Sequence, residues 1–576
     1  MIHDNKTGHR LSSDEIKKLV LSEFGYALIC GFSKEQDPGS ARENRKRFSG
    51  FMDAPTLTEY AISMNAEKPL SVETDIVELN GAQKAAFWFS MGFGNGSPLP
   101  QPSGQYNIYV NDVFCLAVRN VNYSFYWVGE NSEFAFSMRR SETAPPYTGM
   151  TLSPLIENEG QAVFGIGLLV VDKSLVSDGQ TARITIEPVC NYESSRYFYL
   201  SHKNDIIYRT NIWDVLDVIK HKNVKSASGY NVYFGDIHTH SGQMQGNANN
   251  KGCGRGSMEE NYRYAKGPGG LHFYALTDHE WQILPDYEDT YFGLADKHNV
   301  DGEFICLKAF EHTSPVFGHR NIYFKDRGKV ISNVDENGVP MHPRKLMDML
   351  SEYDFFSIPH HTSSASHPFN TDLIYDEDKC VEIYSTWGSS EYLGDFPRGV
   401  SDRHDCYWVS DIMKSSHLLG IVASSDGHDG CPGSGQSPFP YLPHLFHFCG
   451  SGMVAVLSES LTRDNIYDAI KNRMCYATTG PPIVLDVMCG KHHMGSVIRN
   501  QKEPPIFKVS CKGTNKIKEV RVVKNGEIIH VYPCCGKFSA SFDYVDMAFD
   551  GSDATYYIRV VQEDYESAWS SPFFFR

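Results

Sequence analysis

The sequence predicts a multidomain protein of the α/β plus β class, in which one α/β domain lies between two all-β domains. Three observations lead to this prediction. At 576 residues the chain is too long for a single compact core. Its central part alternates apolar strand-like runs with helical stretches, which indicates a parallel sheet or a barrel. The parts on either side contain short strands separated by Gly, Asn and Pro, which is typical of β-sandwiches.

Composition restricts the class of protein and its partners. The chain is 41% hydrophobic and 13% aromatic, as expected for a globular protein, and its net charge is −17. This charge argues against nucleic acid as a partner, because phosphate binding relies on basic surface. The fourteen cysteines include no Cys-x-x-Cys pair, which indicates reduced thiols rather than a disulfide framework.

The N-terminal residues lack the apolar core of a signal peptide. The nearest apolar run, 26–32, is too short to span a bilayer. We therefore expect a cytoplasmic protein that does not contact a membrane. The sequence does not predict the oligomeric state.

The N-terminal part begins with an irregular segment, 1–70, that contains one expected helix at Ser12–Phe24. Residues 71–200 form the first predicted β-sandwich. Its aromatic side chains are interpreted as core and edge packing, with a sugar-stacking platform as the alternative. They are Phe87, Trp88, Phe89, Tyr123, Phe125, Tyr126 and Trp127. Residues 201–229 form a predicted linker with a helix near 212–219.

The predicted α/β domain covers residues 230–480. Its expected helices are Ser257–Lys266, Pro343–Tyr353, Tyr407–Ser416 and Thr462–Arg473. The first begins with Ser257 and Glu260, which have the spacing of a capping box. Residues 481–576 return to strands without helices, and Asn525-Gly526 between two alternating runs predicts a hairpin. This last segment is the predicted immunoglobulin-like sandwich.

Side chains that bind metals gather where the central strands end. His238 and His240 lie two residues apart, so an extended backbone points both imidazoles to one face. The ends of later strands carry Asp278 and His279, Glu311 and His312, His319, His360 and His361, and Asp426 and His428. Parallel α/β folds keep their sites at these strand ends. Desolvating so many ionisable groups is costly unless cations offset the charge, so the pattern predicts a polynuclear metal site.

The order of these motifs resembles the polymerase and histidinol phosphatase (PHP) superfamily. HxH after a strand, TDH, a strand-ending Glu, an isolated His, a His-rich strand end and D-x-H match across about 230–480. GHRNIYF, VEIYSTWGSSE and YYIRVVQEDYESAWSSPFFF resemble its uncharacterised branch with β-sandwich extensions. The resemblance implies a central distorted (β/α)7 barrel with two or three Zn, Mn or Fe ions, flanked by an N-terminal β-sandwich and a C-terminal immunoglobulin-like β-sandwich.

The resemblance also implies which residues hold the ions. The expected ligands of the first ion are His238, His240, Glu311 and Asp426. Glu311 would bridge to a second ion held by His319 and His361, with His360 as the alternative to His361. His279 and His428 would contribute to a third ion. The additional third-site histidine of the superfamily falls on Gly246, and the nearest polar side chains are poor ligands: Gln243, Gln245 and Asn247. Two ions are therefore the expected minimum.

Two ions bridged by a carboxylate activate a shared water, so the predicted activity is hydrolysis by a metal-bridging hydroxide, with a phosphate ester as substrate. Imidazole and carboxylate ligands together suit Zn, Mn or Fe. Further catalytic candidates are Asp278, Arg320, His360, Arg403 and His404. The two arginines and His404 would offset negative charge, with surface salt bridges as the alternative for the arginines. Asp236 and Asp278 would orient ligand histidines, and Asp278 has a proton shuttle as its alternative role.

A second hypothesis is a carbohydrate-active hydrolase or lyase. The chain has no recognisable phosphate-cradling loop, although Gly252, Gly254 and Gly256 make a flexible segment near the site. Tyr384, Trp387 and Tyr392 would stack on a sugar ring. A third hypothesis is a metal-stabilised binding protein without turnover. The expected partner is thus a small-molecule or oligosaccharide substrate.

Overall fold

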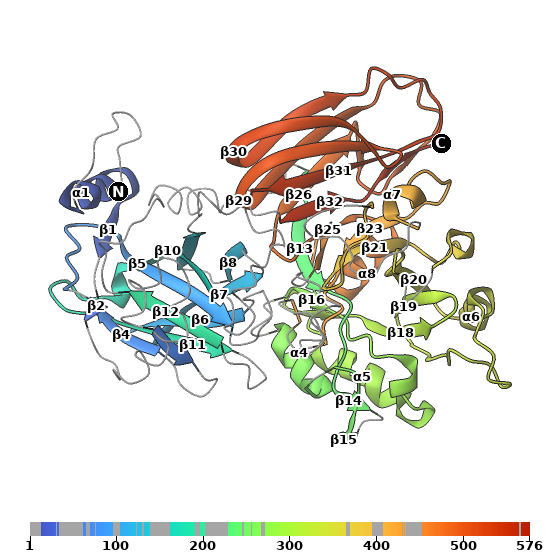
Figure 1. Ribbon diagram of the computed structural model, residues 1–576, viewed down its shortest axis with the longest axis horizontal. Coiled ribbons are helices and arrows are strands. Elements are labelled where there is room, and N and C mark those ends of the chain that lie inside the picture. The colour runs from blue at the N-terminus through green and yellow to red at the C-terminus, as the bar shows by residue number, and fades with distance from the viewer. Residues whose placement is uncertain are drawn as a thin grey trace, which may run out of the picture. The chain divides into compact units, whose positions relative to one another are not determined.

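The chain folds as a mixed α/β protein with many strands and few helices (Figure 1). The computed structural model describes residues 13–29, 32–33, 61–64, 70–74, 76–95, 104–121, 124–128, 132–138, 162–189, 196–201, 228–244, 247–254, 256–266, 271–364, 369–393, 407–428, 430, 432–433, 452–563 and 566–576. It divides into two compact units, Met1–Asn223 and Val224–Arg576. Among the helices in these ranges, none combines the length and the apolar character needed to cross a membrane.

The first unit contains two sheets that pack on a shared core. One sheet consists of β3 (Ala61–Met64), β12 (Arg196–Ser201), β5 (Lys84–Asn95), β10 (Ala162–Asp172) and β9 (Glu133–Met138), with β1 (Tyr26–Ile29) also paired to β5. The other consists of β2 (Phe32–Ser33), β4 (Leu70–Thr74), β11 (Arg183–Val189), β6 (Gly104–Val110), β7 (Val113–Val121) and β8 (Ser124–Val128). Phe87 and Leu169 from the first sheet meet Val72 and Ile108 from the second, as in a β-sandwich.

The sandwich includes strands that the sequence did not predict. The helix α1 (Ser13–Phe24) forms where a helix is expected, but β1, β2 and β3 extend both sheets with residues from the segment interpreted as irregular. Phe87 and Trp88 are buried, as core packing requires. The structure does not describe the side chains of the other five aromatics or the predicted helix near 212–219. A short 3-10 helix, η4 (Lys173–Leu175), follows β10.

Three sheets of the second unit carry the metal-competent residues. In the first, β13 (Asn231–Asp236), β16 (Phe273–Tyr274) and β17 (Ile305–Cys306) are parallel, and β24 (Met453–Ser458) joins β13 in the antiparallel sense. The second is the antiparallel sheet of β18 (Lys308–Ser314), β19 (Gly318–Phe324) and β20 (Phe355–His360). The third pairs β21 (Cys380–Ser385) with parallel β23 (Gly420–Ala423) and with β22 (Gly388–Ser389).

Isolated bridges connect these sheets at their edges. They pair Thr239 with Gly427, His279 with Glu311, and Ser357 with Asp378, each in the parallel sense. The strand ends that bear histidine and carboxylate side chains therefore lie together. The expectation of a purely parallel arrangement is not met, because β19 and β24 run antiparallel to their neighbours. This reversal explains why His319 begins its strand and still faces His360, which ends β20.

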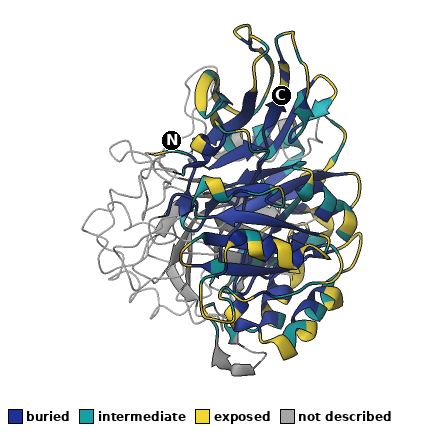
Figure 2. Ribbon diagram, turned by 90° about the vertical axis from the view of Figure 1, so that its right-hand side faces the viewer, coloured by how far each residue is buried: buried dark blue, intermediate teal, exposed yellow. Residues whose placement is uncertain are grey.

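Helices cover the outside of this region, and their exposed positions contrast with the buried strands (Figure 2). They are α4 (Met258–Lys266), α5 (Glu288–His298), α6 (Pro343–Leu350), α7 (Val409–Ile412) and α8 (Arg463–Lys471). Four coincide with predicted helices, and α5 was not predicted. The predicted capping box is present, because Ser257 N donates to Glu260 Oε2 at 2.6 Å and Glu260 N to Ser257 Oγ at 3.2 Å. The remaining short elements are β14 (Gln243–Met244), β15 (Asn247–Lys251), η5 (Glu280–Gln282), η6 (Pro285–Tyr287) and η7 (Thr371–Leu373).

The C-terminal strands continue the sheet that contains β13. From β24 the sheet passes through β25 (Cys475–Thr478) to β32 (Ser567–Ser570), β31 (Ala554–Gln562), β29 (Ile506–Lys524), β26 (Val484–Cys489) and β27 (His492–His493). Also attached are β28 (Val497–Ile498), β30 (Glu527–Val545) and β33 (Phe573–Phe575). Hydrogen bonding thus runs through the predicted boundary at residue 480. The expected hairpin forms between Lys524 and Glu527, where Asn525 and Gly526 have φ of 49° and 76°, as a type I′ turn requires.

Candidate metal centre

The carboxylate of Glu311 lies at the centre of the strand-end cluster. Its Oε2 is 3.2 Å from His238 Nε2 and 3.1 Å from His240 Nε2. Its Oε1 is 2.9 Å from His319 Nδ1 and 3.4 Å from His360 Nε2. The two oxygens therefore face two different groups of imidazoles.

The two carboxylate oxygens of Asp426 also contact different imidazoles. Its Oδ1 is 3.3 Å from His238 Nε2 and 3.1 Å from His240 Nε2. Its Oδ2 is 2.8 Å from His361 Nε2. With Glu311, it thus forms a pair of buried carboxylates between the HxH histidines and the His360-His361 pair at the end of β20. One candidate ligand group contains His238, His240, Glu311 and Asp426, and a second contains His319, His360 and His361.

Electrostatics keeps these carboxylates ionised. Burial by itself favours the uncharged acid, but the imidazoles of His279 and His360 hold the pKa of Glu311 well below its usual range. Burial is likewise opposed at Asp426, whose pKa the imidazoles of His238 and His240 hold well below its usual range. In return, the carboxylates outweigh burial at His238 and raise its pKa to about 10. A bound metal ion would replace such imidazole protons.

The backbone explains how two successive histidines both reach the site. Neighbouring side chains of a strand normally point to opposite faces. His361 follows the last residue of β20 and has a φ of 53°, which is the left-handed region that residues other than glycine seldom adopt. This turn brings His361 to Asp426 while His360 contacts Glu311. Asp426 is also left-handed, with a φ of 48°, and such outliers gather at functional sites.

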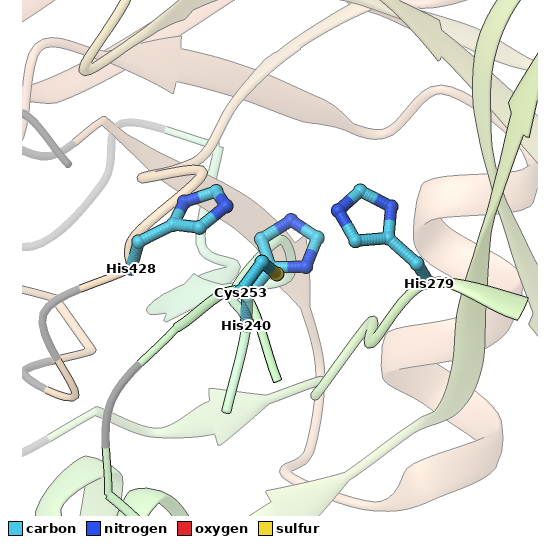
Figure 3. A group of neighbouring side chains, drawn as sticks. All are labelled: His240, Cys253, His279 and His428. Atoms are coloured by element: carbon cyan, nitrogen blue, oxygen red, sulfur yellow. The ribbon is translucent and has the colours of Figure 1, made fainter. Parts of the chain in front are cut away.

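A third group of possible ligands lies beside the first. It contains His240, Cys253, His279 and His428, whose ligand atoms lie within 4.8 Å of one another. Figure 3 shows the His240 ring between those of His428 and His279, with the Cys253 sulfur next to His240. The ring centroid of His240 is 4.5 Å from that of His279 and 4.2 Å from that of His428.

Hydrogen bonds determine which nitrogen each histidine offers. His428 Nδ1 lies 3.0 Å from the carbonyl oxygen of Asp426, so Nδ1 donates and Nε2 remains for a ligand. His238 Nδ1 lies 3.1 Å from Glu382 Oε2, which directs Nε2 to the two carboxylates. The Nδ1 atom of His279 contacts the Thr313 hydroxyl. Each contact resembles the outer-shell partner of a metal-ligating histidine.

The side chains present fit a metal ion. His240 and His360 are fully buried. Their Nε2 atoms lie 3.1 Å and 3.4 Å from Glu311 oxygens, but within the described part of the chain neither Nδ1 atom makes a hydrogen bond. Buried polar atoms normally have partners, so these two Nδ1 atoms require an explanation. Imidazole nitrogens and carboxylate oxygens in this proximity form a donor set that Zn, Mn or Fe accepts.

Asp236 and Asp278, which were expected to orient ligand histidines, accept hydrogen bonds from other groups. Asp236 accepts from the backbone N–H groups of Ser425 at 3.0 Å and Gly433 at 2.8 Å, so it positions the loop that bears Asp426. Asp278 accepts from the backbone N–H and the hydroxyl of Ser241, each at 2.6 Å. Both carboxylates therefore position backbone, and neither has a hydrogen bond to a ligand imidazole among those the structure describes.

Arg320 does not face the metal-competent side chains. It alternates with His319 along β19, and its guanidinium contacts Asp378 Oδ1 at 3.3 Å and the Leu373 carbonyl oxygen at 2.5 Å. This geometry gives Arg320 a packing role on the opposite face of the strand and does not support its expected part in catalysis. Arg403 and His404 lie outside the described residues.

The aromatic residues proposed for sugar binding are dispersed. Tyr384 is buried and stacks on Trp569, and the Tyr392 hydroxyl accepts from Arg521 at 3.3 Å. Of these three residues, Trp387 contacts the centre, with its ring centroid 5.5 Å from that of His361. Gly246 lies outside the described residues, as does Gln245, whereas Gln243 Oε1 accepts from the backbone of Met258.

Sequence reasoning did not identify Glu382, Cys253, Thr313 or Trp281 as part of the site. Glu382 interrupts the apolar run CVEIYS, which is a recognisable signal for a buried functional carboxylate. Trp281 is 44% exposed and stacks on His279, but no pattern in the sequence marks it. Cys253 lies between two glycines, and its role depends on a contact with His240 that only the fold creates.

Comparison with known proteins gives partial matches. A family model described as "Protein of unknown function (DUF3604)" matches residues 440–506, a span that contains none of the three ligand groups. An uncharacterised protein of Chlamydia pneumoniae is 28% identical over 372 residues, which are 60% of this chain and 57% of that protein. An uncharacterised protein of Chlamydia trachomatis is 26% identical over 348 residues, 55% of this chain and 54% of that protein. The chain thus spans about half the length of the curated relatives it matches.

Two solved structures have a distant likeness to the chain. One is a two-domain protein containing a predicted PHP-like metal-dependent phosphoesterase from Bacteroides vulgatus, with a TM-score of 0.30 and 12% identity, covering 61% of this chain and 97% of that one. The other is PsfC from Pseudomonas syringae, with a TM-score of 0.28 and 12% identity, covering 42% of this chain and 90% of that one. At these TM-scores neither likeness supports an argument about function.

Proposed function

We propose that this chain is a metal-dependent hydrolase that cleaves phosphate esters. The observation that carries the proposal is that the two carboxylate oxygens of Glu311 face separate imidazole groups at 2.9–3.4 Å. Asp426 repeats the arrangement. A carboxylate placed in this way is suited to hold two cations side by side. Divalent ions bound there would supply positive charge that activates water and neutralises a phosphoryl group during its displacement.

Each group of residues has a defined part in this proposal. His238, His240, Glu311 and Asp426 would hold one ion, and His319 with His360 or His361 would hold the second. Glu382 fixes the ring of His238, since it lies 3.1 Å from Nδ1. Asp236 and Asp278 hold the backbone that bears the ligands. Zinc, manganese and iron all suit these ligands.

The same proposal takes residues 230–480 as a PHP-like barrel. The isolated bridges at Thr239–Gly427, His279–Glu311 and Ser357–Asp378 support it, because each connects the edge of one sheet to the next. A closed ring of strands would place every ligand at one mouth, where α/β barrels have their active sites.

A carbohydrate substrate is the second candidate. It is favoured by two indole rings at the centre, since Trp281 is 44% exposed and stacks on His279, and Trp387 lies against His361. Indole faces bind the apolar face of sugar rings. A panel of phosphomonoesters, phosphodiesters, and unsaturated and sulfated oligosaccharides separates the two candidates, because phosphate release without sugar cleavage supports only the first.

Elemental analysis and the Glu311→Gln variant test the proposal. The purified chain should contain at least two transition-metal ions per molecule. Because the substitution removes the charge that two cations share, phosphate release should fall by more than about 100-fold, since even outer-shell changes cost about 10–100-fold. Metal content and phosphate release are measured on the same preparations.

Glu336→Gln is the matched control, because Glu336 is an exposed carboxylate of the same unit. It should retain the metal content and activity of the unmodified protein. A folded protein without metal, or phosphate release that is equal in Glu311→Gln and Glu336→Gln, would contradict the proposed function.

A further inference from the structure

Cys253 is held against the metal centre by an unusually close contact between two backbone segments. Gly254 N donates to the Ser241 carbonyl oxygen at 3.0 Å, and Gly252 N to that of Gly242 at 2.8 Å. A Cβ atom at position 254 would lie 2.1 Å from the carbonyl oxygen of His240. One at position 252 would lie 2.4 Å from Gln282 Nε2. Glycine on both sides is therefore required for Cys253 to approach His240.

The surroundings of Cys253 are those of a ligand. Its sulfur belongs to a group with His279, His428 and His240, and all four ligand atoms lie within 4.8 Å of one another. His240 in this group is fully buried; its Nε2 lies 3.1 Å from both Glu311 and Asp426, and its Nδ1 has no hydrogen bond within the described residues. The cysteine thus lies beside an imidazole with one nitrogen that has no hydrogen bond within the described residues, and it has two further imidazoles within reach (Figure 3).

We propose that Cys253 binds, as a thiolate, a third divalent cation together with His279 and His428 beside His240. This proposal rests on the proposed function, because the third ion adjoins the two-ion centre. Cys253 would supply the third-site ligand that the superfamily has at the position of Gly246. The ligand comes instead from a loop seven residues further along the chain.

The chemistry of the donor set selects the ion. A soft thiolate with imidazoles favours zinc, whereas manganese prefers carboxylates and water. On binding, the cation displaces the thiol proton, which passes to solvent. The two-ion centre has oxygen donors from Glu311 and Asp426, so the third position should prefer a different metal ion. Zinc should therefore occupy the Cys253 position even when manganese occupies the other two.

A simpler role for Cys253 is a hydrogen bond to the fold. Its sulfur lies 3.0 Å from Gln282 Oε1, and Gln282 Nε2 donates to the Gln243 carbonyl oxygen at 3.0 Å. If this were its whole role, serine would replace it with little change in metal content. The two roles thus predict different zinc stoichiometry.

Zinc content and X-ray absorption of the full chain loaded with zinc test the proposal. Unmodified protein should show a sulfur neighbour at about 2.3 Å from zinc. Cys253→Ser should lose that sulfur and bind one zinc fewer, and Cys253→His should recover the zinc without the sulfur. Cys535→Ser is the matched control and should behave as the unmodified protein, because Cys535 is the other exposed cysteine among the nine that the structure describes.

Alkylation of Cys253 by iodoacetamide, followed by mass spectrometry, gives a second readout. Zinc should slow it, because a metal-bound thiolate is a poorer nucleophile than a free one. Absence of zinc-bound sulfur in the unmodified protein, or its persistence in Cys253→Ser, would overturn the proposal. Neither readout depends on turnover, so zinc-bound sulfur without phosphate release would refute only the proposed function.

Discussion

At the scale of single residues, Glu382 controls the orientation of the first ligand histidine. It is buried, and its Oε2 lies 3.1 Å from His238 Nδ1. Burial would lower the pKa of His238, but the carboxylates of Asp426 and Glu382 raise it to about 10. The same contact holds the proton on Nδ1 and turns Nε2 toward Glu311.

Removal of this contact should weaken metal binding without removing a ligand. In Glu382→Ala the affinity for metal should fall by about 10–100-fold, as for other outer-shell partners of ligand histidines. Glu382→Gln should recover part of the loss, because its amide oxygen still accepts from Nδ1. Competition with a chelator measures the affinity of both variants.

Glu336→Ala provides the control for general effects of losing a carboxylate, because the side chain of Glu336 is exposed. Its metal affinity should equal that of the unmodified protein. A folded Glu382→Ala variant with unchanged affinity would show that Glu382 does not position His238.

At the scale of elements, a cluster of charges joins α4 to α5. Glu259 on α4 contacts Arg263 at 3.0 Å, Lys297 at 2.9 Å and His298 at 3.0 Å. Burial works against ionisation of Glu259, yet His298 and Lys297 lower its pKa to about 2. The ring of His298 also stacks on Tyr262, with centroids 5.1 Å apart, so charge and packing act at the same interface.

This contact should stabilise the fold in a pH-dependent way. The pKa of Glu259 in the folded chain is about 2, below the unfolded value of about 4.3. Its contribution is therefore complete above about pH 4.3 and is lost as the pH falls toward 2. At about pH 5, Glu259→Gln should cost about 1 kcal/mol after allowance for solvent screening. Urea denaturation at several pH values should show this difference shrinking in acid.

Glu303→Gln tests whether the effect is particular to this cluster. Among the described residues, Glu303 pairs with Lys266, and its side chain is 61% exposed, so its loss should change stability little at any pH. A difference between Glu259→Gln and unmodified protein that stays constant from about pH 5 to pH 2.5 would refute the assignment.

At the scale of the whole molecule, a buried charge network ties the C-terminal strands to the segment that bears Trp387. Glu391 is 1% exposed and follows β22. It accepts from Tyr557 at 2.8 Å, from Trp569 at 2.8 Å and from the Arg559 guanidinium. These three donors belong to β31 and β32, more than 160 residues away in the chain.

Loss of the Arg559 guanidinium from this network should destabilise the second unit strongly. Arg559→Met leaves the carboxylate of Glu391 buried without its charge partner, which costs about 3–5 kcal/mol. The double variant Glu391→Gln with Arg559→Met should be more stable than Arg559→Met alone, because no unpaired charge remains. Urea denaturation followed by tryptophan fluorescence and by circular dichroism measures both.

Arg327→Met serves as the comparison, since the Arg327 guanidinium lies over Tyr353 in a cation–π contact that is worth about 0.5–1 kcal/mol at exposed sites. A cost for Arg559→Met that is no larger than that of Arg327→Met would mean that the network does not hold the C-terminal strands to this segment.

The sequence by itself determined the features that depend on neighbouring residues. The capping box of Ser257 and Glu260, the Asn525-Gly526 turn and the same-face placement of His238 and His240 all follow from local spacing. The clustering of strand-end histidines and carboxylates was also predictable, because adjacent strands bring like ends together. Local spacing did not predict the helix α5. It continues directly from the three-residue 3-10 helix η6, so its start is not separated from the preceding element in the sequence.

Only the tertiary structure decided which side chains meet. Glu382 reaches His238 across 144 residues, and Arg320 turns away to Asp378 across 58. His360 and His361 both reach the centre because one residue is left-handed, which strand periodicity does not anticipate. Cys253 joins His279 and His428 because two glycines allow close backbone contact. Periodicity sets which face a side chain takes, whereas register, strand direction and backbone approach set its partner.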